Sequence, residues 1–466
     1  MQLFRHRLLL TGLVILLSRL PFLFDGFGAE EDAWALPLVA ERIGETGIYE
    51  VSRLPGHPVQ EITYSMMYDA TPVMYNLLTA LISTAGLLAF ALMLRNFGHS
   101  QPLLTTLAVA FTPIVWINST NDLDYTWAMG FILASGFFIS RRFPLMAGLF
   151  TGLAIGCRIT SGAMLLPYAV LIWYTQSTDT RKRQLLLYLL SALTAAAVCF
   201  LPVYIQYGTS FFTYYEHFPI PGFAKNFYKG VLGVWGTPGS IAILAGILLM
   251  ILQQNKSAQT AMDIRIRTGL HHASVFVVLL YTISFIRLPL KSAFMIPLVP
   301  FMILLFSLLL SRPQLRAITV TLFLSGLFFG INLAEANRGS GYSKLALVKN
   351  ISGQQVAFDP LNGLVLADRS KRKQRTAFAQ QVLSTTKNLH EKTYIITGWW
   401  LADLLYLTKD HAHGDILYRY YTDEQELKWY KAQGYKIYYL EDQDELNDLR
   451  FQKTFTRQYA QPLQVR

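Results

Sequence analysis

Apolar segments recur along most of this chain and leave little room for a soluble fold. The 466-residue sequence is 53% hydrophobic and only 15% charged, a balance typical of a polytopic membrane protein. A helix needs about 20 apolar residues to cross a bilayer without tilting. We therefore expect an α-helical polytopic bundle of about eleven transmembrane helices, some of them short, at residues 8–24, 71–94, 103–117, 127–140, 144–156, 161–174, 185–205, 240–252, 273–285, 293–310 and 318–333.

The loops between these segments predict which side of the membrane each one faces. The first segment follows Arg5 and Arg7 and lacks a small-residue cleavage site, so we interpret it as a retained helix rather than a signal peptide. With the N-terminus in the cytoplasm, the strongly basic loops all fall inside, as the positive-inside rule requires. These loops lie at residues 95, 141–142, 181–183, 256–267 and 312–316. The sequence thus predicts a multi-pass protein of a cell membrane, and we expect a bacterial inner membrane.

Charge and cysteine content argue against a nucleic-acid-binding protein and against an exported domain held by disulfides. The net charge of +11 is spread over short loops and a mixed-charge C-terminal segment, so topology explains it and nucleic acid is not an expected partner. Cys157 and Cys199 both lie inside apolar segments, where they would not cross-link an exported domain. The partners that this composition predicts are membrane lipids.

Past residue 333 the sequence changes from apolar runs to short strand and helix patterns. Candidate strands lie at 394–397, 415–421 and 435–440, and candidate helices at 374–389, 400–407 and 423–433. This order predicts a small α/β domain over residues 334–466, outside the membrane and separate from a transmembrane domain over residues 1–333. The basic run 369–373 is interpreted as a solvated lead-in to a helix, with contact to lipid phosphates as the alternative.

Acidic side chains gather in two of the loops that topology places outside. Glu30, Glu31 and Asp32 precede an amphipathic segment that ends near Gly47, and this segment predicts a helix lying flat on the outer surface. Asp122 and Asp124 precede the apolar segment that begins near residue 125. Either cluster could serve only to cap a helix. Acids next to a bilayer otherwise indicate a functional site, because unpaired charges are costly there.

Cations on the same outer side complete a candidate site. Arg158, Arg287 and Lys291 each interrupt or border an apolar segment; snorkelling to lipid headgroups is the alternative explanation. One carboxylate can take a proton from an acceptor hydroxyl while a second holds the acceptor or a divalent cation. Cations can stabilise a phosphate leaving group. This combination suits glycosyl transfer from a lipid phosphate.

Several short motifs in this order resemble a known family. The first span ends in residues 18–21, an acid pair leads a surface helix, and His57-Pro58 precedes the second span. Asp122-Leu123-Asp124, a glycine-rich segment ending at Arg158, and a basic-then-proline segment over residues 287–300 follow. Together they resemble the GT-C membrane glycosyltransferases, particularly the protein mannosyltransferase (family 39) and aminoarabinose transferase relatives, over roughly the first 330 residues.

The resemblance implies a GT-C bundle and a polyprenyl-phosphate sugar as donor. It implies transfer on the extracytoplasmic face, with inversion, to a lipid, glycan or protein acceptor. Asp32 would be the catalytic or acceptor-orienting acid, supported by Glu31 and Asp124, with Asp122 as the other acid of the second pair. Asp32 and Asp124 could also hold Mg²⁺, Mn²⁺ or Zn²⁺. The cations that would bind the donor phosphate are Arg158, Arg287 and Lys291.

This sequence departs from the family pattern at two of these motifs. The acid pair reads Glu31-Asp32 where the family more often has Asp-Glu, and His57-Pro58-Val59 replaces a His-Pro-Pro run. The choice between the acids of each pair therefore stays open.

An aromatic loop over residues 206–239 offers a second candidate region. Its Glu216 and His217, together with His57, could contact the acceptor or the lipid carrier. Anchoring in the membrane interface by aromatic side chains is the alternative. Two other functions remain open for the whole chain: a transporter or flippase of sugars or lipids, and a noncatalytic envelope scaffold. If residues 334–466 choose the acceptor, deleting them should change acceptor use more than donor binding.

Overall fold

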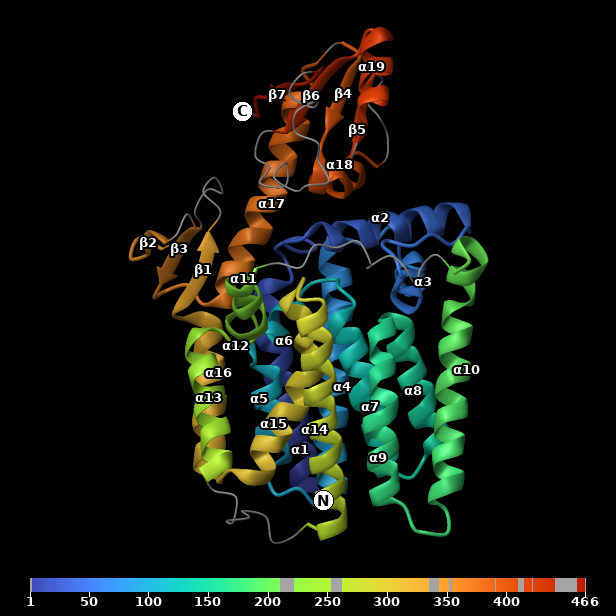
Figure 1. The fold of residues 1–466 in the computed structure, drawn as a ribbon, viewed down its shortest axis with the longest axis vertical. Coiled ribbons are helices and arrows are strands. Elements are labelled where there is room, and N and C mark those ends of the chain that lie inside the picture. Colours follow the sequence, from blue (N-terminus) through green and yellow to red (C-terminus); the bar gives the residue numbers. More distant parts are fainter. Residues whose placement is uncertain are drawn as a thin grey trace.

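A helical bundle carries a smaller region of strands and helices on one end, and one helix lies across that end (Figure 1). The computed structural model describes residues 2–209, 222–252, 262–334, 343–351, 354–389, 391–409, 415–420, 422–440 and 459–465. The N-terminus lies at the end of the bundle away from the strands (Figure 1).

The bundle is built from helices of very different lengths. The longer ones are α1 (Gln2–Arg19), α4 (Pro72–Asn96), α7 (Tyr125–Ser140), α8 (Pro144–Cys157), α10 (Arg181–Tyr207), α13 (Thr237–Leu252), α14 (Ile264–Arg287) and α16 (Arg312–Leu327). The shorter ones are α5 (Pro102–Ala110), α6 (Pro113–Asn118), η2 (Ile159–Met164), α9 (Leu165–Thr175), α11 (Phe223–Phe227), η5 (Tyr228–Leu232), α12 (Gly233–Trp235), η6 (Ser292–Leu298) and α15 (Val299–Leu309).

Proline breaks one of the predicted spans into two shorter helices. The segment 103–117 becomes α5 and α6, because Pro113 cannot donate the hydrogen bond that a continuous helix would need. Among the described residues, four helices are long and apolar enough to cross a membrane, or up to five if the bent pair Lys225–Trp235 and Thr237–Leu252 counts as one span. Three shorter apolar helices, at Tyr125–Ser140, Pro144–Cys157 and Ile159–Thr175, accompany them.

Helix α8 packs closely against α10 because glycines lie on the side of α8 that faces α10. A Cβ added to Gly148 would lie 2.4 Å from the Tyr188 carbonyl oxygen, and one added to Gly152 would lie 2.4 Å from the Ala195 Cβ. Small residues at a spacing of four allow this close packing of membrane helices. The contact fixes the position of the C-terminal end of α8, and the next residue is Arg158.

Helix α2 (Glu31–Thr46) is the surface helix that the amphipathic pattern predicts (Figure 1). Its apolar side, which includes Trp34 and Leu36, is buried. The helix packs on α3 (Pro58–Ser65) and on α18 (Leu401–Thr408). It ends at Gly47, whose φ of 68° is the left-handed conformation that glycine adopts without strain.

Two small sheets follow the bundle. Strands β1 (Gly330–Ala334), β3 (Gln354–Asp359) and β2 (Leu347–Ile351) form an antiparallel sheet in that order. Strands β5 (Ile416–Arg419), β4 (Thr393–Ile396), β6 (Lys436–Leu440) and β7 (Gln461–Leu463) form a parallel sheet. The remaining elements are η1 (Leu20–Phe22), α17 (Leu364–Thr386), η7 (Gly398–Trp400) and α19 (Glu424–Ala432). The elements β4 to β6, α18 and α19 form where the sequence pattern predicts them.

Candidate functional site

The loop between α2 and α3 is shaped around one buried acid, Glu61. Its carboxylate accepts hydrogen bonds from the Tyr49 hydroxyl (2.5 Å), from the amide and hydroxyl of Ser52 (2.7 Å each) and from the His57 amide (3.0 Å). Glu61 has no exposed surface. These contacts hold the loop in place and orient the two basic residues that it carries, Arg53 and His57.

Asp32, in the first turn of α2, lies between two cations. Lys291 donates a hydrogen bond to its Oδ2, and Arg53 Nε lies 3.5 Å from the same oxygen. Burial alone would raise the pKa of the Asp32 carboxyl, but the charges of Arg53 and Lys291 hold that pKa well below its usual range. Lys291 also bonds Glu30 at 2.5 Å, and despite its burial its acidic neighbours raise its pKa well above the usual value.

Asp124 lies on the other side of Arg53 and is more deeply enclosed. Its carboxylate bonds the Arg53 guanidinium and, at 2.8 Å, Arg158 Nη1, while His57 Nδ1 lies 3.5 Å away. Burial raises the pKa of Asp124, but the basic groups around it outweigh this effect and hold the pKa well below its usual range. Asp124 is therefore an ionised acid with a fixed set of partners.

Neither carboxylate caps a helix. Glu30 is the N-cap of α2, which puts Asp32 inside the first turn, and Asp124 is the N-cap of α7 without a capping hydrogen bond from its side chain. The alternative explanation that these two acids only cap helices is therefore wrong. They differ in access, because the Asp32 side chain is 20% exposed and the Asp124 side chain 1%.

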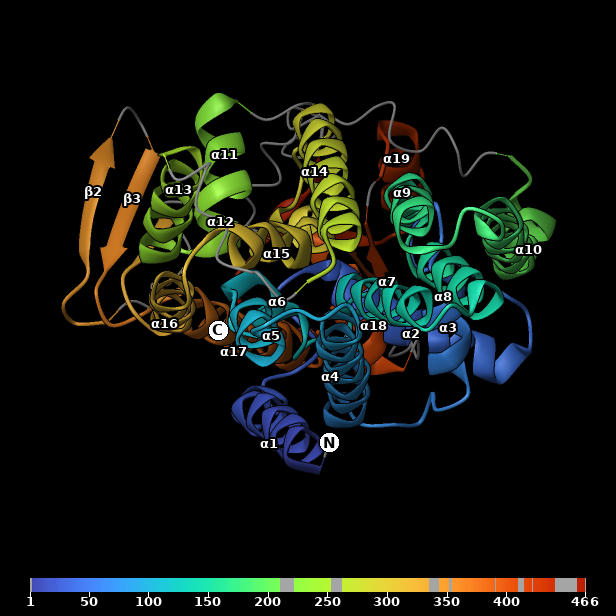
Figure 2. The same ribbon diagram turned by 90° about the horizontal axis from the view of Figure 1, so that it is seen from below.

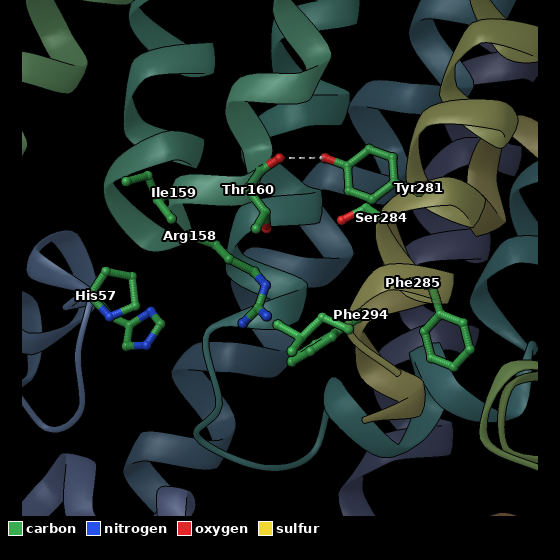
Figure 3. A pocket seen from close by; sticks show the side chains of 10 residues that line it. His57, Arg158, Ile159, Thr160, Tyr281, Ser284, Phe285 and Phe294 are labelled. Carbon is green, nitrogen blue, oxygen red and sulfur yellow. Dashed lines mark hydrogen bonds between the residues drawn. The ribbon is translucent and has the colours of Figure 1, made fainter. Parts of the chain in front are cut away.

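An apolar cavity begins beside this network (Figure 3). The Arg158 guanidinium lies against two neighbouring rings, 4.3 Å from the centroid of Tyr125 and 4.7 Å from that of Phe294. His57 Nδ1 donates to the Cys157 carbonyl at 2.7 Å, which leaves the lone pair on Nε2. The cavity has a volume of about 140 Å³ and is lined by Pro55, His57, Arg158, Ile159, Thr160, Tyr281, Ser284, Phe285, Leu288 and Phe294.

His57 and Arg158 form a polar end of this cavity, and the rest of its wall is mostly apolar apart from Thr160, Tyr281 and Ser284. His57 Nε2 is buried and has no hydrogen-bond partner among the described residues. Burial lowers the pKa of His57, so the ring is neutral at pH 7. A neutral imidazole and a guanidinium thus share one end, and α14 supplies Tyr281 and Phe285 along the wall (Figure 3).

The structure does not bring every predicted residue into this network. Glu31 begins α2 and is half-buried. Arg287, the last residue of α14, is exposed and makes no ion pair within the described part of the chain. Glu216 and His217 lie outside the described residues.

Asp122 has a different environment from Asp124. It has no exposed surface, and neither of its carboxylate oxygens has a hydrogen-bond partner among the residues that the structure describes. Its backbone carbonyl accepts a hydrogen bond from Gln60 Nε2 at 2.6 Å. Burial raises the pKa of the Asp122 carboxyl well above its usual value and so favours the neutral form of this acid.

The donor set at Asp32 and Asp124 does not fit a divalent cation. Arg53 bridges the two carboxylates, and Lys291 and Arg158 neutralise them further. No group of three or more His, Cys, Asp or Glu side chains suited to a metal occurs in the described ranges. A metal bound by both acids would have to displace Arg53.

Arg53 and Glu61 are site residues that the sequence analysis missed. Arg53 is a cation in the same outer loop as the acid cluster, and that loop's excess of acids was a signal for it. Glu61 follows His57 by four residues, so a helix starting at Pro58 returns its side chain to the His57 amide. Either residue can be recognised as part of the site only when the loop is folded.

Helix α17 joins the C-terminal region to the loop before Asp124. Arg372 is 2% exposed, and its guanidinium donates to the carbonyl oxygens of Thr120 (2.7 Å) and Ile117 (3.1 Å) and to Asp368 (2.6 Å). The basic run 369–373 thus lies inside α17 and does not lead into a helix; Lys371 and Lys373 are exposed as predicted, whereas Arg372 is buried. Arg372 is buried because it satisfies the carbonyl groups at the end of α6.

The same helix also reaches the loop before Asp32. Arg375 bonds both oxygens of Asp403, at 2.7 and 2.6 Å, and its Nη1 lies 3.5 Å from the Ala29 carbonyl oxygen. Tyr406 of α18 packs edge-to-face on Phe27, with ring centroids 4.9 Å apart. The C-terminal region thus contacts both loops that carry the acidic site residues.

Comparison with known proteins identifies the fold. No protein-family model and no curated protein matches this sequence. The crystal structure of ArnT from Cupriavidus metallidurans bound to undecaprenyl phosphate matches with a TM-score of 0.56 and 14% identity, over 88% of this chain and 85% of that one. The apo structure of the same ArnT matches with a TM-score of 0.57 and 13% identity, over 98% of this chain and 89% of that one.

The likeness shows that this chain shares the fold of ArnT. At this level of identity it shows the fold and not the chemistry. The specific resemblance to the protein mannosyltransferases stays a prediction.

Proposed function

We propose that this membrane protein is a glycosyltransferase that moves a sugar from a polyprenyl-phosphate donor to an acceptor in the cell envelope. The observation that carries this proposal is an apolar cavity whose polar end, Arg158 and His57, adjoins the Asp32–Arg53–Asp124 network. The fold supports it, because ArnT shares that fold and has been solved bound to undecaprenyl phosphate.

The cavity suits both the polyprenyl chain and the phosphate of such a donor. Phe285, Leu288 and Phe294 offer apolar surface to the first isoprene units. The Arg158 guanidinium lies at the phosphate end with one nitrogen on Asp124 and its face against Tyr125, so it is held in a fixed orientation. A preoriented guanidinium can bind a phosphate through two nitrogens without further rearrangement.

Transfer in this site is a single displacement at the anomeric carbon. An acceptor hydroxyl attacks that carbon, its proton passes to an Asp32 carboxylate oxygen, and the bond from the anomeric carbon to the phosphate oxygen breaks. The electron pair leaves on the polyprenyl phosphate, where Arg158 and Lys291 stabilise the charge. Attack opposite the leaving phosphate inverts the anomeric configuration.

The two acids have different roles in this proposal. Asp32 is the general base, because it is the acid with exposed surface and the one bonded to Lys291. Asp124 is a positioning residue, because its oxygens are already bound to Arg53 and Arg158. Glu31 supports Asp32 at the start of α2. No step uses a metal ion.

The remaining parts of the proposal follow from topology. We place the site on the extracytoplasmic side, with the N-terminus in the cytoplasm of a bacterial cell and the C-terminal α/β region outside. The acceptor is a lipid, glycan or protein of the envelope. Contact of Glu216 and His217 with the acceptor or the lipid carrier remains a prediction.

A transfer assay tests the proposal. Purified wild type would be incubated with a panel of radiolabelled polyprenyl-phosphate sugars and envelope acceptors, beside Asp32→Asn and the matched control Glu45→Gln, an exposed acid on the same helix. We expect transfer by wild type and Glu45→Gln, and a loss of about hundredfold or more in Asp32→Asn, as for removal of a general base.

The same preparation distinguishes the competing functions. Asp32→Asn should retain the wild-type melting temperature within a few degrees. If wild type transfers no sugar from any donor, while vesicles containing Asp32→Asn still move a labelled lipid-linked sugar across the bilayer, the protein is a transporter and the proposal fails.

A further inference from the structure

A second cavity lies at the opposite end of the bundle, away from the strands. It has a volume of about 490 Å³. Its walls come from three places: the start of α1, the turn into α5, and the start of α16. Helix α5 packs against both α1 and α16, so these segments meet although they are far apart in sequence (Figure 2).

Two arginines from different helices line this cavity. Arg7 on α1 and Arg312 on α16 are both exposed, and neither forms an ion pair within the described part of the chain. A nearby cation, Arg95, is placed differently, because its guanidinium lies over the ring of Phe4, 3.9 Å from the centroid. The cavity thus carries two unneutralised positive charges.

Helix α5 adds to the positive potential. It begins at Pro102, and no side chain caps its N-terminal end. Its first residues, including Leu103 and Leu104, line the cavity. The unpaired amide groups of such a helix end carry partial positive charge. Helix α5 is nine residues long, and here its dipole acts together with the two guanidinium groups.

The other lining residues are apolar. Leu3, Phe4, Leu103 and Leu104 form a wall beside the charged groups. A free inorganic anion would use only the charged part. A molecule with an anionic head and acyl chains would use both parts, and the end of a membrane bundle is where such heads lie.

We propose that this cavity is a binding site for the headgroup of an anionic glycerophospholipid. Its phosphate lies between Arg7 and Arg312 at the start of α5, and its acyl chains follow the apolar wall. Gln101 Oε1, which is buried and has no hydrogen-bond partner in the described ranges, can accept a hydrogen bond from a headgroup hydroxyl. The site is independent of the proposed glycosyl transfer.

Native mass spectrometry of the full chain, stripped of lipid, tests this proposal with defined lipids. The probes are dioleoyl phosphatidylglycerol, which is anionic, and dioleoyl phosphatidylcholine, which is zwitterionic. The double variant Arg7→Ala/Arg312→Ala is compared with Arg5→Ala/Arg316→Ala, which removes two exposed arginines from the same two helices outside the cavity.

We expect wild type to retain phosphatidylglycerol over phosphatidylcholine. Affinity for phosphatidylglycerol should fall roughly thirtyfold in Arg7→Ala/Arg312→Ala, from about a fivefold factor per cation, and less than about twofold in the control. Replacement of both arginines by lysine should restore most of the binding. An equal loss in the two alanine variants would mean diffuse surface attraction and would overturn the proposal.

Two further outcomes also decide against it. Equal retention of the two lipids would show that headgroup charge is not recognised, and displacement of phosphatidylglycerol by millimolar inorganic phosphate would identify a free-anion site. If the alanine variant does not fold, a photoreactive phosphatidylglycerol on wild type gives the answer. It should label peptides that contain residues 3–7 and 100–104, and labelling only elsewhere contradicts the site.

Discussion

Arg53 is the residue that makes two separate acid clusters into one site. It contacts Asp32 at 3.5 Å through Nε and bonds Asp124 through Nη2, so neither carboxylate can move without disturbing the other. On the far sides of this pair lie Lys291 and Arg158. Acidic and basic groups therefore alternate. A substitution at one position should change the pKa of the neighbouring group.

The pH dependence of transfer should report that coupling. Lys291→Met removes a cation that lowers the pKa of Asp32. The Asp32 pKa then rises. On acidification the base is therefore protonated at a higher pH than in wild type, and activity is lost at that higher pH. The measurement is the rate of transfer against pH, with the exposed Lys225→Met as control. An acid limb at the same pH in all three proteins would contradict the assignment of Asp32 as base.

The second acid loop allows a paired test. Burial favours the neutral form of Asp122, so Asp122→Asn should change the rate by no more than about threefold and the stability by about 1 kcal/mol or less. Asp124→Asn leaves Arg53 and Arg158 without their shared partner and should cost about 3 kcal/mol of stability and most of the activity. Rates and melting temperatures of both variants check this. The opposite ranking would show that Asp122 is the functional acid.

Single residues could be predicted only where their chemistry was already unusual in the sequence. Asp32, Asp124, Arg158 and Lys291 stand out as charges next to apolar segments, and the structure brings them together. Glu61 did not stand out, because its role comes from the shape of a loop that folds around it. Glu30 was not among the predicted site residues, yet it bonds Lys291, a residue far away in the sequence.

At the scale of elements, α17 connects the C-terminal region to the site loops. Arg372 holds the backbone at Ile117 and Thr120, directly before the loop of Asp124. Arg375 approaches Ala29, directly before the loop of Asp32. The contacts indicate that the C-terminal region supports the geometry of the acids, whatever it does for acceptor choice. Deleting residues 334–466 should therefore disturb more than acceptor use.

Substitutions within α17 test this support without a deletion. Arg372→Ala removes the hydrogen bonds to the Thr120 and Ile117 carbonyls and should lower the transfer rate about tenfold or more by displacing the Asp124 loop. Binding of undecaprenyl phosphate should fall less than the transfer rate, because the cavity itself is formed by other elements. Lys371→Ala, an exposed neighbour, is the control. Equal losses of rate and binding would indicate general unfolding instead.

Helices and strands could be predicted where one hydrophobic pattern dominates the segment. The surface helix α2 and the strands β4 to β6 form close to where the sequence predicts them. The antiparallel sheet of β1, β2 and β3 was not predicted, because the polar residues after Leu333 obscure it. The early start of α17 was missed since its basic residues suggested solvent, whereas Arg372 is buried against backbone carbonyls.

The whole molecule has two ends with different chemistry. The end near α2 holds an acid–cation network beside an apolar cavity, and the other end holds a basic cavity with no acidic partner among its lining residues. Composition and loop charge predicted a membrane bundle, and the order of short motifs predicted the fold that ArnT shares. The spans could not be counted from sequence, because three apolar helices of the described chain are shorter than a straight crossing needs and one pair is bent.

The central claim is that the cavity at Arg158 binds a polyprenyl phosphate. The most direct measurement is equilibrium binding of undecaprenyl phosphate to the purified protein, since it requires no knowledge of the sugar or the acceptor. We predict saturable binding to wild type, a loss of about tenfold or more in Arg158→Gln, and an unchanged affinity in Arg287→Gln, whose arginine is exposed outside the cavity. Wild-type affinity in Arg158→Gln would contradict the account.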